Sequence, residues 1–129
     1  MKRSEMREQA FLLTFEGLFS SGQDIDEVIE LYSENVEAVS EYAKDVFVGV
    51  KGSKNELDEI INKYSKSWKA ARLPKVTLAI LYVALYEMKN VEDVADSIAI
   101  NEAVELAKKY ASSNDASYIN GVLGAVSRG

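Results

Sequence analysis

The sequence predicts an all-α fold, and three observations carry this prediction. Apolar residues recur at intervals of three and four over most of the 129 residues, which is the period of an α-helix. No segment shows the alternation of apolar and polar residues that marks a half-buried strand. Residues typical of helix ends, such as Gly52 and Pro74, separate the periodic stretches. We therefore expect seven helices in two sub-bundles, residues 1–66 and 67–129, which together form one domain.

The N-terminal half provides a helical face in each expected element. The first helix covers MKRSEMREQAFLLTF, and on a helical wheel its outward face holds Glu5 and Gln9. An apolar stripe from Val36 to Val50 predicts a helix that stops at Gly52. The next helix has capping-box spacing, Ser53-Lys-Asn-Glu56, and buries Leu57, Ile60, Ile61 and Tyr64.

The C-terminal half predicts three further helices. Pro74 suits the first turn of a helix that runs to about Lys89, because a missing amide hydrogen costs nothing there. This helix is apolar nearly all round, so we expect it at the centre of the fold. Apolar residues between Ile100 and Ala107 mark another helix, and Asp115 is expected to cap the last one.

The charge is unevenly distributed along the chain. The net charge is −6, and residues 20–64 alone hold 11 acidic and 4 basic side chains. This balance argues against a general nucleic-acid binder, because the acidic segment repels phosphates, but it permits a local site elsewhere. The longest apolar run, 76–88, falls short of the roughly 20 residues that a membrane span needs, so no membrane partner is expected.

Most catalytic chemistry is missing from the sequence. The chain has no histidine and no cysteine, which excludes Ser-His-Asp triads, thiolate nucleophiles and the usual zinc sites. Carboxylates spaced by three and four are typical of a solvated helix face: Glu27, Glu30, Glu34, Glu37 and Glu41. We therefore expect neither an enzyme nor a cofactor or metal. The absence of cysteine fits the reducing cytoplasm.

The first residues pose the main question, because an acidic chain places Lys2, Arg3 and Arg7 against an apolar seam. On the wheel, Arg3 and Arg7 flank Thr14 at the edge of that seam. One interpretation is structural: the side chains run over the bundle edge and pair with carboxylates. The other is a phosphate contact, with Phe15, Tyr110 and Tyr118 as candidate rings for base stacking.

Glu87 is the second residue with two interpretations. It lies near the end of the apolar helix, in the segment ALYEM, and must find a partner or the surface. Pairing within the fold is the more common outcome. The alternative is an acidic group that faces a basic protein.

Three segments resemble the NusB family of bacterial transcription antitermination factors. They are REQAFLLTFEGLFS from Arg7, RLPKVTLAILYVALYEM from Arg72, and AINEAVELAKKY with SYINGVLG in the C-terminal third. The acidic middle, residues 24–64, is similar mainly in its helical pattern. The resemblance implies two three-helix bundles packed against each other.

The resemblance also implies a function and site residues. It implies binding of boxA-type single-stranded RNA together with NusE, a small-subunit ribosomal protein, within the RNA polymerase antitermination complex that transcribes ribosomal RNA operons. Residues that match the family's RNA-contacting positions are Lys2, Arg3, Arg7, Phe15, Tyr110 and Tyr118. Glu87, with Tyr86 beside it, matches the position that faces NusE.

An alternative function keeps the same fold but removes the RNA. In it the chain is a helical protein-interaction module or a homodimer, and its basic residues are purely structural. The thin basic cluster, interrupted by Ser4, Glu5 and Met6, leaves this alternative open. Three basic contacts predict a salt slope of only about −2 for single-stranded RNA, so we expect RNA binding to depend on a partner.

Overall fold

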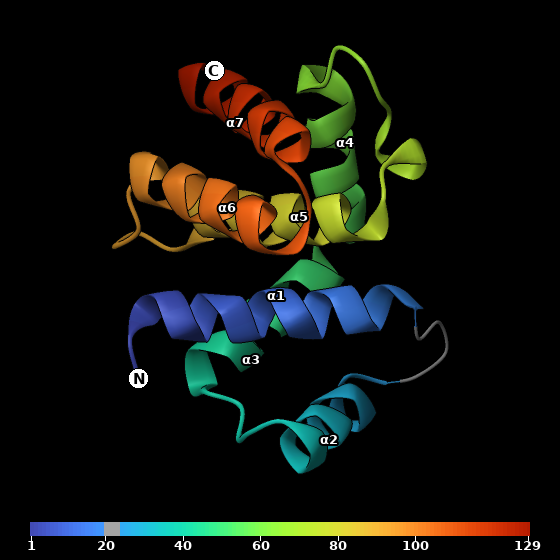
Figure 1. Cartoon of the computed structure of the whole chain (residues 1–129), viewed down its shortest axis with the longest axis vertical. Coiled ribbons are helices and arrows are strands. Elements are labelled where there is room, and N and C mark those ends of the chain that lie inside the picture. Colours follow the sequence, from blue (N-terminus) through green and yellow to red (C-terminus); the bar gives the residue numbers. More distant parts are fainter. Residues whose placement is uncertain (20–23) are drawn as a thin grey trace.

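The computed structural model describes residues 1–19 and 24–129, and within these it forms seven α-helices and one 3₁₀ turn (Figure 1). This confirms the predicted all-α fold. The elements are α1 (Arg3–Phe19), α2 (Ile25–Asn35), α3 (Glu41–Gly52), α4 (Lys54–Tyr64), η1 (Ala70–Arg72), α5 (Lys75–Asn90), α6 (Asp96–Tyr110) and α7 (Ser113–Arg128). No helix of this described part is both long and apolar enough to cross a membrane.

Helix caps explain several of these bounds. Asp24 accepts a hydrogen bond from the Glu27 amide at 2.8 Å and begins α2. The expected capping box at Ser53 does not form, because that side chain makes no cap hydrogen bond. The cap of α7 is Ser112 rather than Asp115: the Ser112 hydroxyl accepts from the Asp115 amide at 3.1 Å.

Helix α5 lies at the centre, as its apolar sequence predicts. Its residues Leu81, Tyr82 and Leu85 are at most 1% exposed, and it packs against α1, α3, α4, α6 and α7. Burying each such side chain contributes about 1.5–3 kcal/mol. Pro74 is the residue before this helix rather than its first turn.

Packing links helices from both halves of the chain. Helix α1 lies between α3 on one side and α5 on the other, with α2 beyond α3 in the view of Figure 1. Helix α4 packs against α5 and α7, and Figure 1 shows it beside them, above α1. The sequence grouped α4 with the N-terminal helices, within residues 1–66, and this division stays a prediction. Helix α4 also packs against α3, and its apolar residues Leu57 and Ile61 are buried.

The loop between α2 and α3 differs most from the expected pattern. Helix α3 begins at Glu41, so Val36 lies outside it and is 63% exposed. Gln9, expected on the outward face of α1, is instead buried and holds this loop. Its amide nitrogen donates to Glu37 and to the Ala38 carbonyl, each at 3.0 Å, and its oxygen accepts from the Ser40 amide at 2.9 Å. The five carboxylates from Glu27 to Glu41 therefore do not lie on one helix, because α2 ends at Asn35 and α3 begins at Glu41.

Candidate functional site

The N-terminus of α1 presents two basic side chains at the surface. Lys2 and Arg3 are exposed. The Arg3 guanidinium lies 4.0 Å from the centroid of the Tyr42 ring and 3.6 Å from an Asp93 carboxylate oxygen. Both interactions are near water and are worth at most about 1 kcal/mol each, so Arg3 can exchange them for a phosphate.

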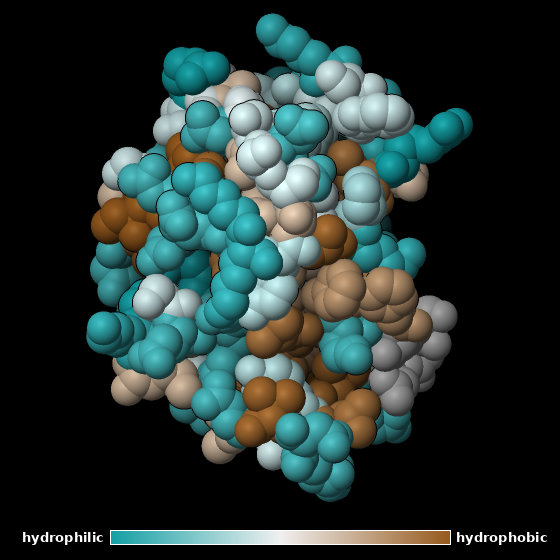
Figure 2. Space-filling model, in the orientation of Figure 1, coloured by the Kyte–Doolittle hydropathy of each residue, from teal (hydrophilic) through white to brown (hydrophobic). Residues whose placement is uncertain are grey.

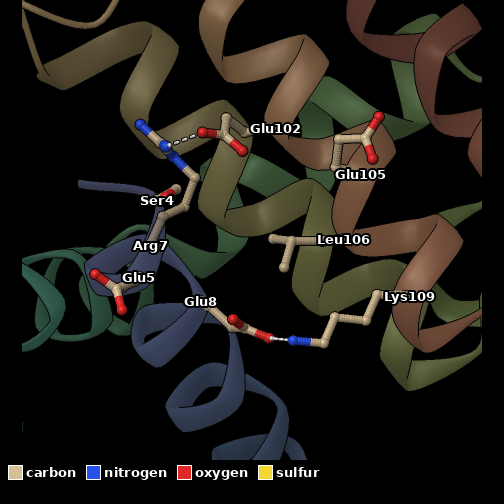
Figure 3. Close-up of a pocket in the computed structure, with 8 residues that line it drawn as sticks. All are labelled: Ser4, Glu5, Arg7, Glu8, Glu102, Glu105, Leu106 and Lys109. Atoms are coloured by element: carbon tan, nitrogen blue, oxygen red, sulfur yellow. Dashed lines mark hydrogen bonds and ion pairs between the residues drawn. The ribbon is translucent and has the colours of Figure 1, made fainter. Parts of the chain in front are cut away.

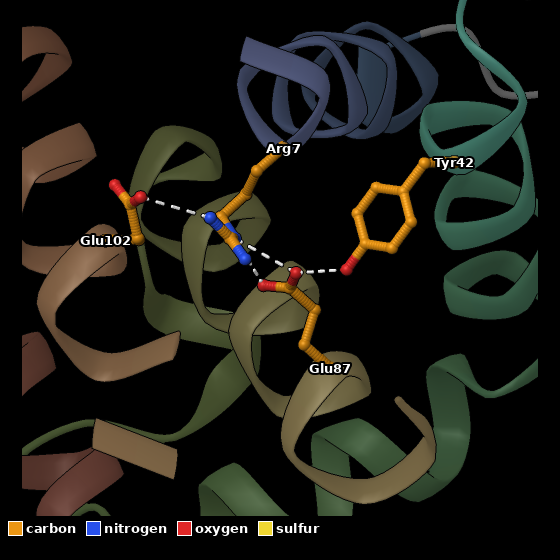
Figure 4. A network of polar contacts seen from close by, with 4 residues as sticks. All are labelled: Arg7, Tyr42, Glu87 and Glu102. Carbon is orange, nitrogen blue, oxygen red and sulfur yellow. Dashed lines mark hydrogen bonds and ion pairs between the residues drawn. The ribbon is translucent and has the colours of Figure 1, made fainter. Parts of the chain in front are cut away.

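Arg7 lies in a buried polar network that joins four helices (Figure 4). Its Nε donates to both carboxylate oxygens of Glu87, at 2.8 and 2.9 Å. Its Nη1 lies 3.2 Å from Glu102, and the Tyr42 hydroxyl donates to Glu87 from the other side. Arg7 is 3% exposed and Glu87 is 0% exposed. The network therefore connects α1, α3, α5 and α6 at the centre of the molecule.

The electrostatics of this network favour the ion pair. Burial works against the charge of Arg7, but the hydrogen bond and the negative charge of Glu87 raise its pKa above the ordinary value. Burial and the Glu87 hydrogen bond also raise the pKa of Tyr42, so that phenol stays a donor. Breaking such a pair leaves an uncompensated buried charge, which costs about 3–5 kcal/mol.

These placements change the expected roles of Arg7 and Glu87. The sequence assigned them to RNA and NusE, but neither side chain has surface to offer in this structure. The physical reason is that Glu87 of α5 lies opposite Arg7, and a helical wheel of α1 cannot show a partner 80 residues away. For each of these residues, one interpretation from the sequence was an ion pair within the fold. The structure shows that they pair with each other.

A hollow of about 260 Å³ borders this network on the surface (Figure 3). It lies between the N-terminal half of α1 and α6, and Glu8 lies near its opening with its carboxylate bound to Lys109 at 2.6 Å and to the Tyr110 hydroxyl. Burial opposes the charge of Glu8, but hydrogen bonds from Lys109 and Tyr110 lower its pKa below the ordinary value. Four carboxylates and two cations line the hollow: Glu5, Glu8, Glu102, Glu105, Arg7 and Lys109. This balance suits a cationic group better than a phosphate.

The candidate rings Phe15 and Tyr110 come together through Phe11. The ring centroids of Phe11 and Tyr110 are 5.0 Å apart, and those of Phe11 and Phe15 are 6.1 Å apart. Phe15 in turn contacts Phe19, at 4.9 Å in an edge-to-face geometry, and Phe19 is 60% exposed. Figure 2 shows apolar surface gathered at the C-terminal end of α1. Tyr110 is 37% exposed, so this ring cluster reaches solvent at both ends.

Tyr118 lies apart from that cluster in the contacts of the described residues. It is half-buried on α7, and its hydroxyl is 2.6 Å from the hydroxyl of Ser65, at the end of α4. Tyr86, expected beside the NusE surface, is also half-buried. It packs directly on α3, where a Cβ on Gly49 would lie 2.2 Å from its ring. Because glycine has no Cβ, position 49 leaves room for the Tyr86 ring.

Sequence reasoning missed the connection between α4 and α5. Residues 66–75 hold Lys66, Lys69, Arg72 and Lys75 and no acidic residue, and Trp68 between them is 56% exposed. A count of charge in short windows would have found this segment, because it is the most basic stretch of an acidic chain.

Taken together, these features define a helical binding protein, with a structural ion pair at its centre and separate basic and aromatic areas on its surface. The model of the NusB family matches residues 4–128, and the chain belongs to this family. Family membership confirms the resemblance read from the sequence. It also agrees with the prediction that the chain is not an enzyme, because the curated relatives are named as transcription antitermination proteins.

Two curated relatives illustrate the similarity. The transcription antitermination protein NusB of Acetivibrio thermocellus is 43% identical over 107 residues, which cover 83% of this chain and 73% of the relative. That of Clostridium novyi is 35% identical, with 96% of each chain covered.

Solved structures agree with this assignment. Thermotoga maritima NusB superposes with a TM-score of 0.87 at 27% identity and covers 99% of this chain and 92% of its own. A second match has a TM-score of 0.87 at 25% identity, with 98% and 96% covered. Its structure is described as antitermination factors NusB and NusE in complex with double-stranded RNA.

Proposed function

We propose that this chain is an RNA-binding transcription antitermination factor that acts with NusE. The observation that supports this most is the match over nearly the whole chain to a NusB solved together with NusE and RNA. We further propose that its RNA target is of the boxA type and that it acts in the cytoplasm, within the RNA polymerase complex that transcribes ribosomal RNA operons.

The proposed RNA surface includes the N-terminus of α1 and the ring cluster. Lys2 and Arg3 are exposed and supply phosphate contacts. Phe15, towards the C-terminal end of α1, and Tyr110, the last residue of α6, offer ring faces. Arg7 has a positioning role in this proposal: its ion pairs with Glu87 and Glu102 fix α1 against α5 and α6. These contacts hold the basic N-terminus of α1 in a fixed position relative to the aromatic rings.

The proposed NusE surface is centred on Tyr86. Its ring packs on Gly49 and stays partly exposed, so it offers contact area in a fixed position. Glu87 acts indirectly: its carboxylate accepts hydrogen bonds from Tyr42 and Arg7, which fix α5, the helix that carries Tyr86, against α3 and α1.

RNA anisotropy with a labelled boxA-like oligonucleotide tests the proposal directly. We expect weak binding by the chain alone and tighter binding when NusE is added. A Lys2→Gln/Arg3→Gln double variant should weaken RNA binding, while a Lys44→Gln/Lys54→Gln double variant on α3 and α4 is a control with the same charge change at other exposed sites. Binding that NusE does not tighten would contradict the proposal. A stable homodimer by light scattering, with no RNA binding, would favour the protein-interaction alternative.

A further inference from the structure

The connection between α4 and α5 concentrates unpaired positive charge. Four of the ten residues from 66 to 75 are basic and none is acidic, although the net charge of the chain is −6. No ion pair among the described residues engages Lys66, Lys69 or Arg72. All three side chains are exposed. They therefore remain available to an anionic partner at no cost in internal contacts.

This connection is held in a defined shape. The Asn62 side chain accepts from the Ala70 amide at 2.8 Å, and the Ser65 hydroxyl accepts from the Trp68 amide at 3.2 Å. Ala70 and Leu73 are buried at 4% and 9% exposure, which fixes η1 to the core. Trp68 is left 56% exposed although tryptophan usually loses most of its surface on folding. A fixed backbone that presents an exposed indole is typical of a stacking platform.

A pocket of about 380 Å³ opens beside Trp68, within the size range of small-ligand sites. Trp68, Pro74 and Tyr118 line it with rings, Asn114 contributes an amide, and Arg72 and Asp115 contribute one charge of each sign. Tyr118 is fixed by its hydroxyl contact with Ser65, at 2.6 Å.

The pocket also contains an unsatisfied polar group. Thr77 lines it, is 0% exposed, and its hydroxyl has no hydrogen-bond partner within residues 1–19 and 24–129. Burying a hydroxyl without a partner costs about 1–3 kcal/mol. A polar group entering the pocket would remove that cost, so Thr77 points to a ligand with hydrogen-bonding edges rather than a purely apolar one.

The pocket continues the ring cluster of α1. The Lys75 ammonium, next to Pro74, lies 5.4 Å from the centroid of the Phe19 ring. From Phe19 the rings lead through Phe15 and Phe11 to Tyr110. A series of ring contacts, with Phe11 buried and Phe19 and Tyr110 exposed, thus runs from α6 to Lys75 at the start of α5. Exposed rings beside basic residues are typical of proteins that bind single-stranded nucleic acid.

We propose that this pocket takes one unstacked base of single-stranded RNA. Trp68 stacks on the base, while Thr77 and Asn114 bond to its polar edge. Lys66, Lys69 and Arg72 hold the flanking phosphates. A base presents a flat face for the indole and donors and acceptors for the two polar side chains, whereas a duplex keeps its bases stacked and cannot fill the pocket. This inference rests on the proposed RNA-binding function and assigns it a site that the N-terminal residues do not include.

Trp68 is the chain's one tryptophan, so its fluorescence reports directly on the pocket. Unlabelled boxA-like RNA is titrated into the protein, alone and with NusE, and Trp68→Phe serves as the background in the complex. We expect quenching that saturates at the same RNA concentration as the anisotropy of labelled RNA. The same sequence as a duplex should give much weaker quenching. Single abasic substitutions along the RNA should remove quenching at one position only.

Variants provide an independent readout. Trp68→Ala should weaken RNA binding about 5- to 150-fold, the loss of one stacked base, and Trp68→Phe should retain most of the affinity. Thr77→Val keeps the shape and removes the hydroxyl, so it should leave the melting temperature unchanged or raised and weaken binding about 2- to 10-fold.

Two results would overturn the inference while leaving the proposed function intact. One is RNA binding by anisotropy with unchanged tryptophan fluorescence and unchanged affinity in Trp68→Ala. The other is equal quenching by duplex and single strand. RNA that fails to bind with or without NusE would overturn both proposals at once, so the outcomes separate the two claims.

Discussion

The N-terminal half of α1 and the α4–α5 connection both carry clustered positive charge, yet the fold uses the two clusters differently. Arg7 is buried against Glu87 and Glu102, and Arg3 lies near Asp93. Lys66, Lys69 and Arg72 have no such partners among the described residues. The comparison shows that the number of cations in a segment says less about RNA binding than their pairing does. Charge that is neutralised within the fold stabilises the fold, whereas unpaired charge can stabilise a complex.

The largest expected effect comes from breaking the buried pair. Arg7→Ala leaves Glu87 charged and buried, so we expect a loss of about 3–5 kcal/mol in the free energy of unfolding, a fall of roughly 10–20 °C in Tm. Urea unfolding measures it. Arg3→Ala is the matched control and should cost about 1 kcal/mol or less, because Arg3 is 42% exposed. Equal stabilities of the two variants would contradict the structural role of Arg7.

A double variant sharpens that result. Arg7→Met combined with Glu87→Leu replaces both charges with apolar groups, so no uncompensated charge remains. We expect the double variant to be more stable than either single variant, by about 3–5 kcal/mol in the same unfolding experiment, because it no longer carries the cost of an unpaired buried charge. If the free energy of unfolding of the double variant falls by the sum of the two single losses, the pair does not act as a unit.

Single cations from the two clusters should differ in RNA affinity. Arg72→Gln removes an unpaired charge, so we expect about a 3- to 10-fold loss by anisotropy. Arg3→Gln should cost less, about 2- to 3-fold, because Arg3 must leave Asp93 and the Tyr42 ring before it binds a phosphate. Reversal of this order would place the main phosphate contact at the N-terminus.

Glu8 offers the smallest effect and a pH dependence. Its pKa is lowered in the folded state, so its contribution to stability is present above the ordinary carboxyl pKa and disappears as the pH falls through the folded value. Glu8→Gln should therefore lower Tm by about 2 °C or less at neutral pH. It should leave Tm unchanged at a pH below the pKa of Glu8 in both the folded and the unfolded state. It also releases Lys109 and Tyr110, so RNA affinity should rise about 2- to 5-fold. Glu5→Gln, on the same turn of α1 and exposed, is the control for the loss of one negative charge.

The sequence predicted the helices well because their apolar periodicity reports directly on burial. The central position of α5 and the end of α3 at Gly52 follow from that pattern alone. Residues whose partners lie far along the chain were less predictable. Gln9 reaches the loop before α3, and Arg7 reaches Glu87, so each leaves the surface for a contact that no single-helix pattern contains.

The functional surface was predictable only in part. Lys2 and Arg3 are exposed as expected, and Phe15 and Tyr110 do come together. Trp68 and Thr77 belong to no sequence motif, and their significance depends on the exposure of one and the unsatisfied hydroxyl of the other. These properties arise only when α5, α7 and the α4–α5 connection meet.

The salt dependence of RNA affinity for two charge-block variants tests this account most directly. One variant carries Lys66→Gln, Lys69→Gln and Arg72→Gln, and the other carries Lys2→Gln and Arg3→Gln. Each phosphate contact to single-stranded RNA contributes about −0.7 to the slope of log K against log salt. We expect the first variant to reduce the slope by about 2 and the second to reduce it by about 1 or less. A slope that the first variant leaves unchanged, with the full loss in the second, would contradict it.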